Sequence, residues 1–110
     1  MEYASGNIYI REMVLAKAGD TIDGHAHNFD HTTYVVRGAI QIERLDTDGN
    51  VIQTVEKRAT KGYNWVLIKA GTAHRITALE DNSLAHCIYS HRTPQGEIVQ
   101  EWDGWAEATF

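Results

Sequence analysis

Three of the six histidines in this 110-residue chain lie close together, at His25, His27 and His31 in the stretch GHAHNFDHTTYVVRGAI (24–40). On a strand, residues two apart face the same side, so His25 and His27 would present their imidazoles together. Buried imidazoles need hydrogen-bond partners or a shared cation. If the chain turns at 28–30, His31 opens the next strand and approaches the same point. The spacing fits either a metal site or a solvent-facing polar strand edge.

A fourth histidine, His74, follows the turn-like segment Lys69–Ala73 and starts another apolar run. Three or four imidazoles that converge inside a barrel form a nitrogen-rich site. Such a site suits iron, copper, nickel, zinc and, with less affinity, manganese. Spacing alone does not bring His74 to the other three histidines, because it lies far from them in the sequence.

Short apolar or alternating runs follow one another along the chain and predict strands. Asp46–Asn50 is the strongest hairpin signal, since Asp-Gly supplies the positive φ of a tight turn, and the runs on either side of it should pair. Many short strands separated by turn signals predict an all-β sandwich or barrel. The predicted strands are Asn7–Ala16, Thr32–Gly38, Ala39–Leu45, Val51–Lys57, Tyr63–Gly71, His74–Leu79 and Leu84–Arg92.

Length and charge exclude several classes of protein. A chain of 110 residues suits one domain that buries a core without a structural metal, and its single cysteine, Cys87, forms no intrachain disulfide. The formal net charge of −5 and the lack of a basic cluster argue against nucleic-acid binding. No apolar run approaches the roughly 18 residues of a membrane span, and the first residues do not resemble a signal peptide. We therefore expect a cytoplasmic protein with no nucleic-acid or membrane partner.

Two segments carry a resemblance to the cupin superfamily. Gly24–Gly38 resembles its first signature, in which a His-x-His pair precedes an acidic ligand and then a glycine. Lys69–His74 (KAGTAH) is similar to the second signature, Pro-x-Gly-x-x-His, with Lys69 in place of the proline. His31 stands where a glutamate ligand is usual. This pattern resembles the four-histidine branch of small bacterial cupins, which hold manganese or iron.

The resemblance implies a fold and a cofactor. The fold is a single cupin domain over 1–110, a double-stranded β-helix (jelly-roll) whose barrel spans about 8–92. The cofactor is one divalent transition metal, with manganese or iron favoured and nickel, zinc or copper possible. A histidine in place of the glutamate removes one negative charge from the ligand set and weakens its preference for hard cations. The implied ligands are His25, His27, His31 and His74.

Strand alternation predicts the walls of the pocket around these ligands. Thr33 and Val35 share the strand face of His31, and Ile76 shares that of His74. Cys87 has two roles open to it. It lines the pocket, as the resemblance to four-histidine cupins implies, or it is a small buried hydrophobe, which is the more common role of a free cysteine.

Three functions remain open at this stage. The first is a dioxygenase-type oxidoreductase that uses the metal on a small, partly apolar substrate. The second is a Lewis-acid isomerase, epimerase or lyase for a small sugar- or acid-like substrate. The third is a non-catalytic cupin that binds a metal or a small molecule. No general acid or base can be assigned, so the catalytic residues are unknown.

The remaining expectations concern assembly. On Asn7–Ala16, alternation places Tyr9, Met13 and Leu15 on one face, and we expect an exposed sheet edge near Tyr9–Leu15. The tail 93–110, which carries Trp102 and Trp105, is expected to pack on the barrel or on a partner subunit. Together the edge and the tail predict a homodimer.

Overall fold

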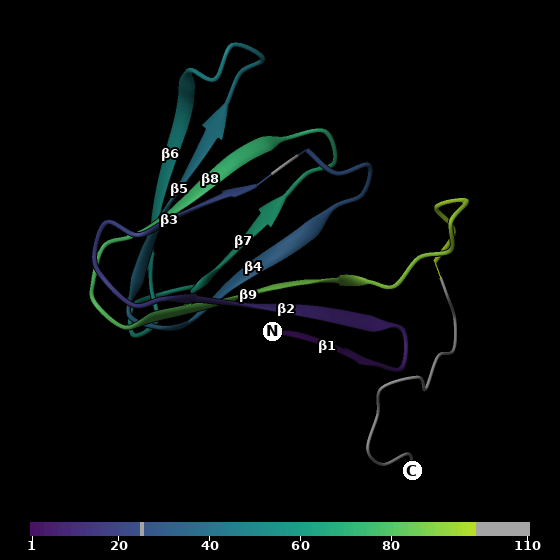
Figure 1. Ribbon diagram of the computed structural model, residues 1–110, viewed down its shortest axis with the longest axis horizontal. Coiled ribbons are helices and arrows are strands. Elements are labelled where there is room, and N and C mark those ends of the chain that lie inside the picture. The colour runs from purple at the N-terminus through teal and green to yellow at the C-terminus, as the bar shows by residue number, and fades with distance from the viewer. Residues whose placement is uncertain (25, 99–110) are drawn as a thin grey trace.

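The computed structural model describes residues 1–24 and 26–98, and within them the chain is built from strands alone (Figure 1). No helix long and apolar enough to cross a membrane occurs in these residues. The all-β prediction is confirmed. The strands are β1 (Glu2–Ser5), β2 (Ile8–Leu15), β3 (Thr21–Gly24), β4 (His31–Arg37), β5 (Ala39–Leu45), β6 (Val51–Arg58), β7 (Trp65–Ile68), β8 (Ala73–Ala78) and β9 (Ser83–Ser90).

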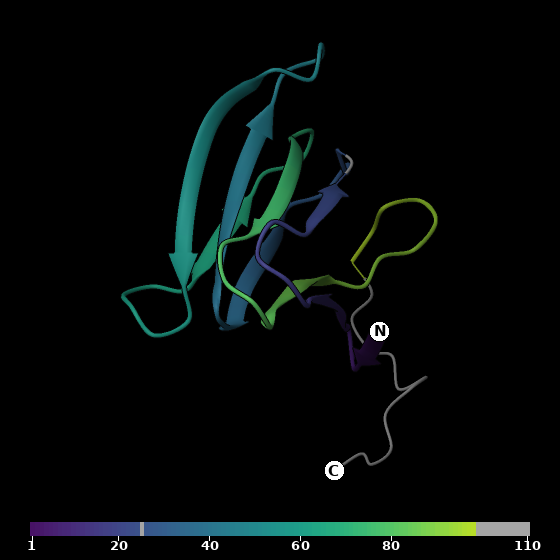
Figure 2. The ribbon, with the colours of Figure 1, turned by 60° about the vertical axis from the view of Figure 1, so that its left-hand side comes forward.

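The strands form two antiparallel sheets that face each other (Figures 1 and 2). The five-stranded sheet has the order β1-β2-β9-β4-β7, and the four-stranded sheet has the order β3-β8-β5-β6. The chain passes from one sheet to the other between β4 and β5 at Gly38, whose φ is +77°. This arrangement is the two-sheet sandwich of a jelly-roll.

The core fills the space between the sheets with inward-facing apolar side chains. Val35 and Ile40 are fully buried, one from each sheet, because alternate residues of a strand point to the same face. The buried cluster consists of Met13, Leu15, Val35, Ile40, Ile42, Ile68, Ile76, Ala78 and Ala85.

The predicted hairpin at Asp46–Asn50 is present and joins β5 to β6. The Asp46 carboxylate accepts hydrogen bonds from the backbone N–H groups of Asp48 and Asn50, at 2.9 and 2.8 Å. Gly49 has a φ of +83°, as the Asp-Gly signal requires. Hydrogen bonds to these backbone groups lower the pKa of Asp46. The turn chemistry therefore sets the pairing of the two strands.

The expected exposed edge near Tyr9–Leu15 is contradicted in its first half. β1 pairs with residues 8–11 of β2, and the backbone N–H of Glu12 donates to the Met1 carbonyl, whereas no strand of the described residues pairs with residues 13–15 on the side away from β9. The covering strand, Glu2–Ser5, is too short to show an alternating pattern, and only the Gly6-Asn7 turn after it signals a hairpin. The homodimer and the cytoplasmic location stay predictions.

The chain continues beyond β9 into a turn. The backbone N–H of Thr93 donates to the carbonyl of Glu97 at 2.8 Å, and Arg92 forms a bridge with Ile98. The tail prediction for 99–110, including Trp102 and Trp105, lies outside the described residues.

Candidate metal centre

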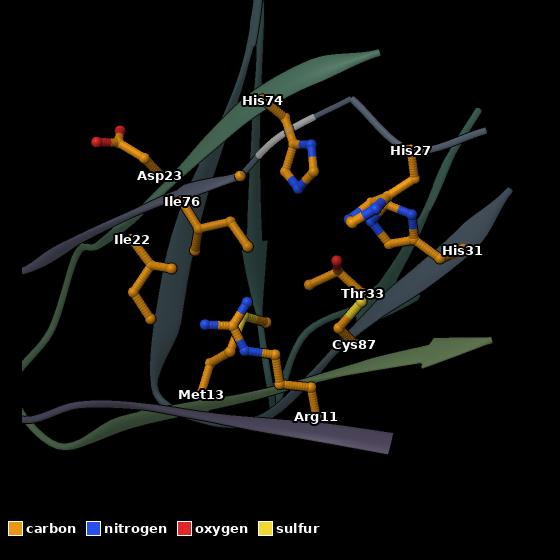
Figure 3. A pocket seen from close by; sticks show the side chains of 11 residues that line it. Arg11, Met13, Ile22, Asp23, His27, His31, Thr33, His74, Ile76 and Cys87 are labelled. Carbon is orange, nitrogen blue, oxygen red and sulfur yellow. The ribbon is translucent and has the colours of Figure 1, made fainter. Parts of the chain in front are cut away.

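A small pocket opens between the two sheets at the end where β3 stops and β4 begins (Figure 3). Its cavity volume is about 60 Å³. Three of the predicted ligands and three of the four predicted pocket residues line it. The lining residues are Arg11, Met13, Ile22, Asp23, Gly24, His27, His31, Thr33, His74, Ile76 and Cys87.

Cross-strand register brings these residues together from distant parts of the chain. In the five-stranded sheet, Cys87 on β9 is the register partner of both Arg11 on β2 and Thr33 on β4. Directly paired residues share a face, so the three form one row across the sheet that faces the cavity. In the opposite sheet, Gly24 pairs with His74. The histidines are thus held between two rigid sheets.

His27, His31 and His74 come together in the pocket. The ring centroids of His27 and His31 are 5.2 Å apart, and those of His31 and His74 are 5.3 Å apart. His31 is the first residue of β4, as predicted, and His74 lies on β8. Both are almost fully buried, with exposed fractions of 3% and 6%. The fourth predicted ligand, His25, lies outside the described residues.

The expectation that His27 lies on a strand is wrong. β3 ends at Gly24, and residues 26–30 belong to no strand, with bends at Asn28 and Phe29. The His27 ring stacks on Phe29 at a centroid distance of 5.0 Å. His27 therefore reaches the pocket from a connection, and its orientation does not follow from strand alternation.

The turn before β8 holds this connection in place. The backbone N–H of Gly71 donates to the His27 carbonyl at 2.7 Å. The Asp30 carboxylate accepts hydrogen bonds from the N–H of Ala70, at 2.8 Å, and from Nζ of Lys69, at 3.1 Å. These bonds lower the pKa of Asp30. Asp30 therefore ties the segment of His27 and His31 to the segment of His74, and Lys69, which replaces a motif proline, is its ion-pair partner.

Gly24 leaves room for the His74 ring. A Cβ placed on Gly24 would lie 2.6 Å from Cε1 and 2.8 Å from Cδ2 of His74, which no real contact tolerates. The His74 Nδ1 lies 3.3 Å from the carbonyl oxygen of Thr72. When Nδ1 carries the proton and donates to that oxygen, Nε2 is left as the electron-pair donor. Figure 3 shows the ring pointing into the cavity.

His31 is the most constrained of the three imidazoles. Its Nδ1 is buried and has no hydrogen-bond partner among the described residues. Burial, with the nearby His74 and His27, lowers the pKa of His31 from 6.5 to about 4. The ring is therefore neutral at neutral pH, which is the form that binds a metal.

The imidazole side chains in the pocket are of a type that binds divalent transition metals. Neutral imidazoles are common ligands of such metals, and an orphaned buried ring nitrogen is a group that a metal would satisfy. Within residues 1–24 and 26–98, no three His, Cys, Asp or Glu side chains lie close enough to form a closed metal site. The imidazole donors are of a kind that such a metal accepts, while the described histidines by themselves do not form a closed site.

The predicted pocket residues lie as alternation placed them, with one exception. Thr33, Ile76 and Cys87 line the cavity, whereas Val35 does not. Val35 lies two residues deeper on β4 and packs into the core between the sheets, with no exposed surface. Burial raises the pKa of Cys87 to about 11, so its thiol is neutral.

The sequence reasoning missed Arg11, whose side chain enters the pocket from β2 (Figure 3). The signal was available, because alternation had already placed Tyr9, Met13 and Leu15 on one face. Arg11 lies between Tyr9 and Met13 and shares that face. A charged residue in the middle of an inward-facing set marks a polar function at that position.

No family model matches the chain, and no curated protein matches it. Solved structures do. An oxalate decarboxylase from Lactobacillus farciminis, in complex with formate, has a TM-score of 0.62 and 22% identity over 79% of this chain and 24% of its own. KdgF from Halomonas sp. has a TM-score of 0.63 and 20% identity, covering 86% of this chain and 79% of its own.

A cupin-2 domain containing protein from Shewanella frigidimarina has a TM-score of 0.56 and 15% identity, covering 77% of this chain and 72% of its own. This chain spans about a quarter of the length of the oxalate decarboxylase. At these identities the likeness is one of fold, and it places the described strands in the same two-sheet architecture.

Proposed function

Because this chain has the fold of the cupin superfamily, we propose that it is a small metal-dependent cupin enzyme. Its activity is that of a dioxygenase-type oxidoreductase on a small, partly apolar substrate. One observation carries the proposal: His27, His31 and His74 converge in one pocket, where Nδ1 of the buried His31 has no partner. A buried imidazole nitrogen without a partner, such as Nδ1 of His31, is costly unless a ligand satisfies it.

The proposed ligands are these three histidines together with His25. Manganese or iron is favoured, and nickel, zinc or copper would also accept four imidazoles. Redox-active iron or manganese, when bound, supplies the chemistry that activates dioxygen. Burial keeps the His31 ring neutral and so ready to act as a ligand. The hydrogen-bonded connection at Asp30 keeps the two ligand-bearing segments together.

The chain's apolar residues select the substrate and exclude water. Met13 and Ile76 are buried and face the cavity from opposite sheets, and Ile22 packs beside them. A cavity of about 60 Å³ holds only a few non-hydrogen atoms. These features favour a small substrate with an apolar portion.

A second candidate, Lewis-acid isomerase, epimerase or lyase chemistry on an acid-like substrate, is favoured by a different observation. The Arg11 guanidinium lines the same cavity, and a cation there attracts an anionic group. In this function the metal polarises a carbonyl without changing its oxidation state. The solved oxalate decarboxylase, which acts on an acid, has the same fold.

Metal analysis of the purified protein tests the central claim. The wild type is expected to hold a stoichiometric transition metal, and His27→Ala to lose most of it. His86→Ala is the matched control, since His86 is next to Cys87 on β9, faces the other way and lies 3.4 Å from Glu12. If the wild type contains no transition metal and cannot be loaded with one, the proposal fails.

Dioxygen uptake separates the two catalytic candidates. Protein loaded with Fe(II) is mixed with small candidate substrates, and oxygen consumption is followed together with substrate loss. Consumption matched to substrate loss supports the dioxygenase. Substrate conversion without oxygen consumption supports Lewis-acid chemistry. Metal binding with no conversion under either condition supports a binding cupin.

A further inference from the structure

Arg11 is a cation on the inner face of the sandwich. It lies on β2 between Tyr9 and the buried Met13, and Figure 3 shows its guanidinium extending into the cavity. Arg11 is exposed to solvent, so its guanidinium lies where the cavity meets water and can pair with an anionic group that enters there. The surroundings of Arg11 show whether the protein itself already supplies such a partner.

Within the described part of the chain, the Arg11 side chain has no hydrogen bond and no ion pair. Other arginines do: Arg58 pairs with Glu80 at 2.7 Å, and Arg75 pairs with Glu43 at 3.1 Å. These pairs lie outside the pocket. Arg11 is, among the described residues, an arginine with no such pair that lines this cavity.

The acidic and titratable neighbours of Arg11 do not neutralise it. Glu2 is the cross-strand partner of Arg11, and its carboxylate accepts a hydrogen bond from the Tyr9 hydroxyl. Burial and, to a smaller extent, this hydrogen bond raise the pKa of Tyr9. Asp23 also lines the pocket, but its carboxylate points away from Arg11 (Figure 3). Cys87, the register partner on the other side, is a neutral thiol.

Thr33 supplies a second unpartnered polar group on the same wall. It is 1% exposed, and its Oγ1 is buried with no hydrogen-bond partner among the described residues. Arg11, Cys87 and Thr33 form one cross-strand row. Neighbouring strands are about 4.8 Å apart, so Arg11 and Thr33 are about 10 Å apart at the backbone. Both side chains line the same cavity (Figure 3).

We propose that Arg11 and Thr33 form a carboxylate-binding subsite, and that the substrate is therefore a small carboxylate anion. The planar guanidinium matches the two oxygens of a carboxylate, and the Thr33 hydroxyl donates a further hydrogen bond. The rest of the ligand then extends toward the histidines. The cavity of about 60 Å³, room for about four water molecules, limits the ligand to a few non-hydrogen atoms. This inference rests on the proposed function for the role of the histidines.

Glycolate and its uncharged analogue glycolamide are suitable probes, since they differ mainly in charge. Titration calorimetry on metal-loaded wild type is expected to show glycolate binding at least about tenfold more tightly than glycolamide. Arg11→Met, which keeps an unbranched apolar stem and removes the guanidinium charge, should abolish this preference. Arg11→Lys should retain part of the preference for glycolate. Thr33→Val should lower the affinity for glycolate by about tenfold.

The matched control is Arg37→Met. Arg37 also lies on a strand of the five-stranded sheet, but its guanidinium binds the backbone oxygen and the side chain of Asn82, away from the pocket. Its removal should leave glycolate affinity unchanged. The inference is overturned if Arg11→Met keeps wild-type glycolate affinity, or if inorganic phosphate binds more tightly than glycolate.

Metal content of every variant separates this inference from the proposed function. Arg11→Met and Thr33→Val should hold as much metal as the wild type, because neither side chain is a proposed ligand. If the wild type holds no metal, the proposed function fails. The glycolate titration of the metal-free protein still reports whether Arg11 selects a carboxylate.

Discussion

Ser83 and Thr33 are both buried hydroxyl residues of the five-stranded sheet, yet their surroundings differ. Ser83 is fully buried at the start of β9, and its hydroxyl lies 2.9 Å from the carbonyl oxygen of Glu80 and 3.1 Å from that of Ala39. It also accepts a hydrogen bond from the Ala39 N–H at 3.3 Å. Thr33 is equally buried, and its hydroxyl has no partner in the described residues.

The end of the sandwich near Ser83 and the end with the pocket differ in the same way as these two hydroxyl groups. At the Ser83 end the backbone passes between sheets at Gly38, where a Cβ would lie 3.0 Å from the Cα of Ser83, and the Ser83 hydroxyl bonds backbone groups of the fold. At the pocket end, both Thr33 and His31 keep a buried polar atom unpaired. Buried polar groups are nearly always paired, so a ligand in the cavity would satisfy the Thr33 hydroxyl and the His31 nitrogen; Nε2 of His86 and Nε of Arg92 also lack hydrogen-bond partners in the described residues, but they do not line this cavity.

Gly24→Ala is expected to give the largest effect, because it fills the space of the His74 ring. Gly24 does not have a positive φ, so alanine suits its backbone and the cost falls on the neighbouring ring. We expect metal affinity to fall by about 10- to 100-fold, comparable to loss of a residue that orients a ligand. Metal titration with a competing chelator measures it.

A double-mutant cycle is the control for this prediction. If Gly24→Ala acts by displacing His74, it should have little further effect on metal affinity in a His74→Ala background. Additive losses from the two substitutions would contradict the steric explanation. They would also weaken the difference between the pocket end and the Ser83 end of the sandwich, because Gly24 would then support the fold rather than the His74 ring.

The pH dependence of the metal-free protein tests His31 next. Its folded pKa, about 4, lies below the ordinary value of 6.5, so the unfolded chain binds a proton first as pH falls. His31 therefore costs no stability above about pH 6.5, and stability falls between that value and about pH 4. Allowing for solvent screening at the open pocket, we expect a loss of about 2 kcal/mol.

Urea unfolding of chelator-treated protein, from neutral pH to about pH 4, measures this loss. A His31→Leu variant is the reference, because all other titrating groups are common to both proteins. The difference between the two stability curves should fall with pH in the stated window. A constant difference would show that His31 is not desolvated. Thr33 would then be the one remaining group that distinguishes the pocket end from the Ser83 end.

The sequence predicted most of the strands, because they depend on local patterns, but it missed β1 and β3. Three of the four histidines singled out by their spacing and by the family resemblance line one pocket, while their role as ligands stays a prediction. Alternation and the Asp-Gly turn placed β5 and β6, and the turn at 28–30 placed His31 at the start of β4. The irregular path of His27 was not predictable, since it depends on hydrogen bonds from the distant turn at Ala70 and Gly71. Such contacts carry no local signature.

The unpaired atoms of Thr33 and His31, together with Arg11, show a second limit of prediction from the sequence. Alternation placed Thr33 on the face of His31 and contained the information for Arg11. It did not reveal which polar groups lack partners, because this depends on what every neighbouring strand supplies. The part of the β2 edge that β1 covers was mispredicted for the same reason, since pairing with this short strand is a tertiary outcome.

Ser83→Ala is expected to destabilise the protein by about 1–2 kcal/mol, because it removes the partner of buried backbone groups at Glu80 and Ala39. Metal content should not change, because Ser83 does not line the pocket. Urea unfolding at neutral pH gives the stability, and metal analysis gives the control. A loss of metal without a loss of stability would show that Ser83 serves metal binding rather than the fold.

Thr33→Val should give the smallest change in stability, within about 0.5 kcal/mol of the wild type. Valine has nearly the shape of threonine, and the hydroxyl it replaces has no hydrogen bond to lose in the described structure. Removing an unpaired buried hydroxyl can even stabilise the fold, so an increase is within expectation. A loss of 1 kcal/mol or more in the same urea measurement would show that Thr33 is paired in solution as Ser83 is, and the hydroxyl would no longer indicate a ligand site.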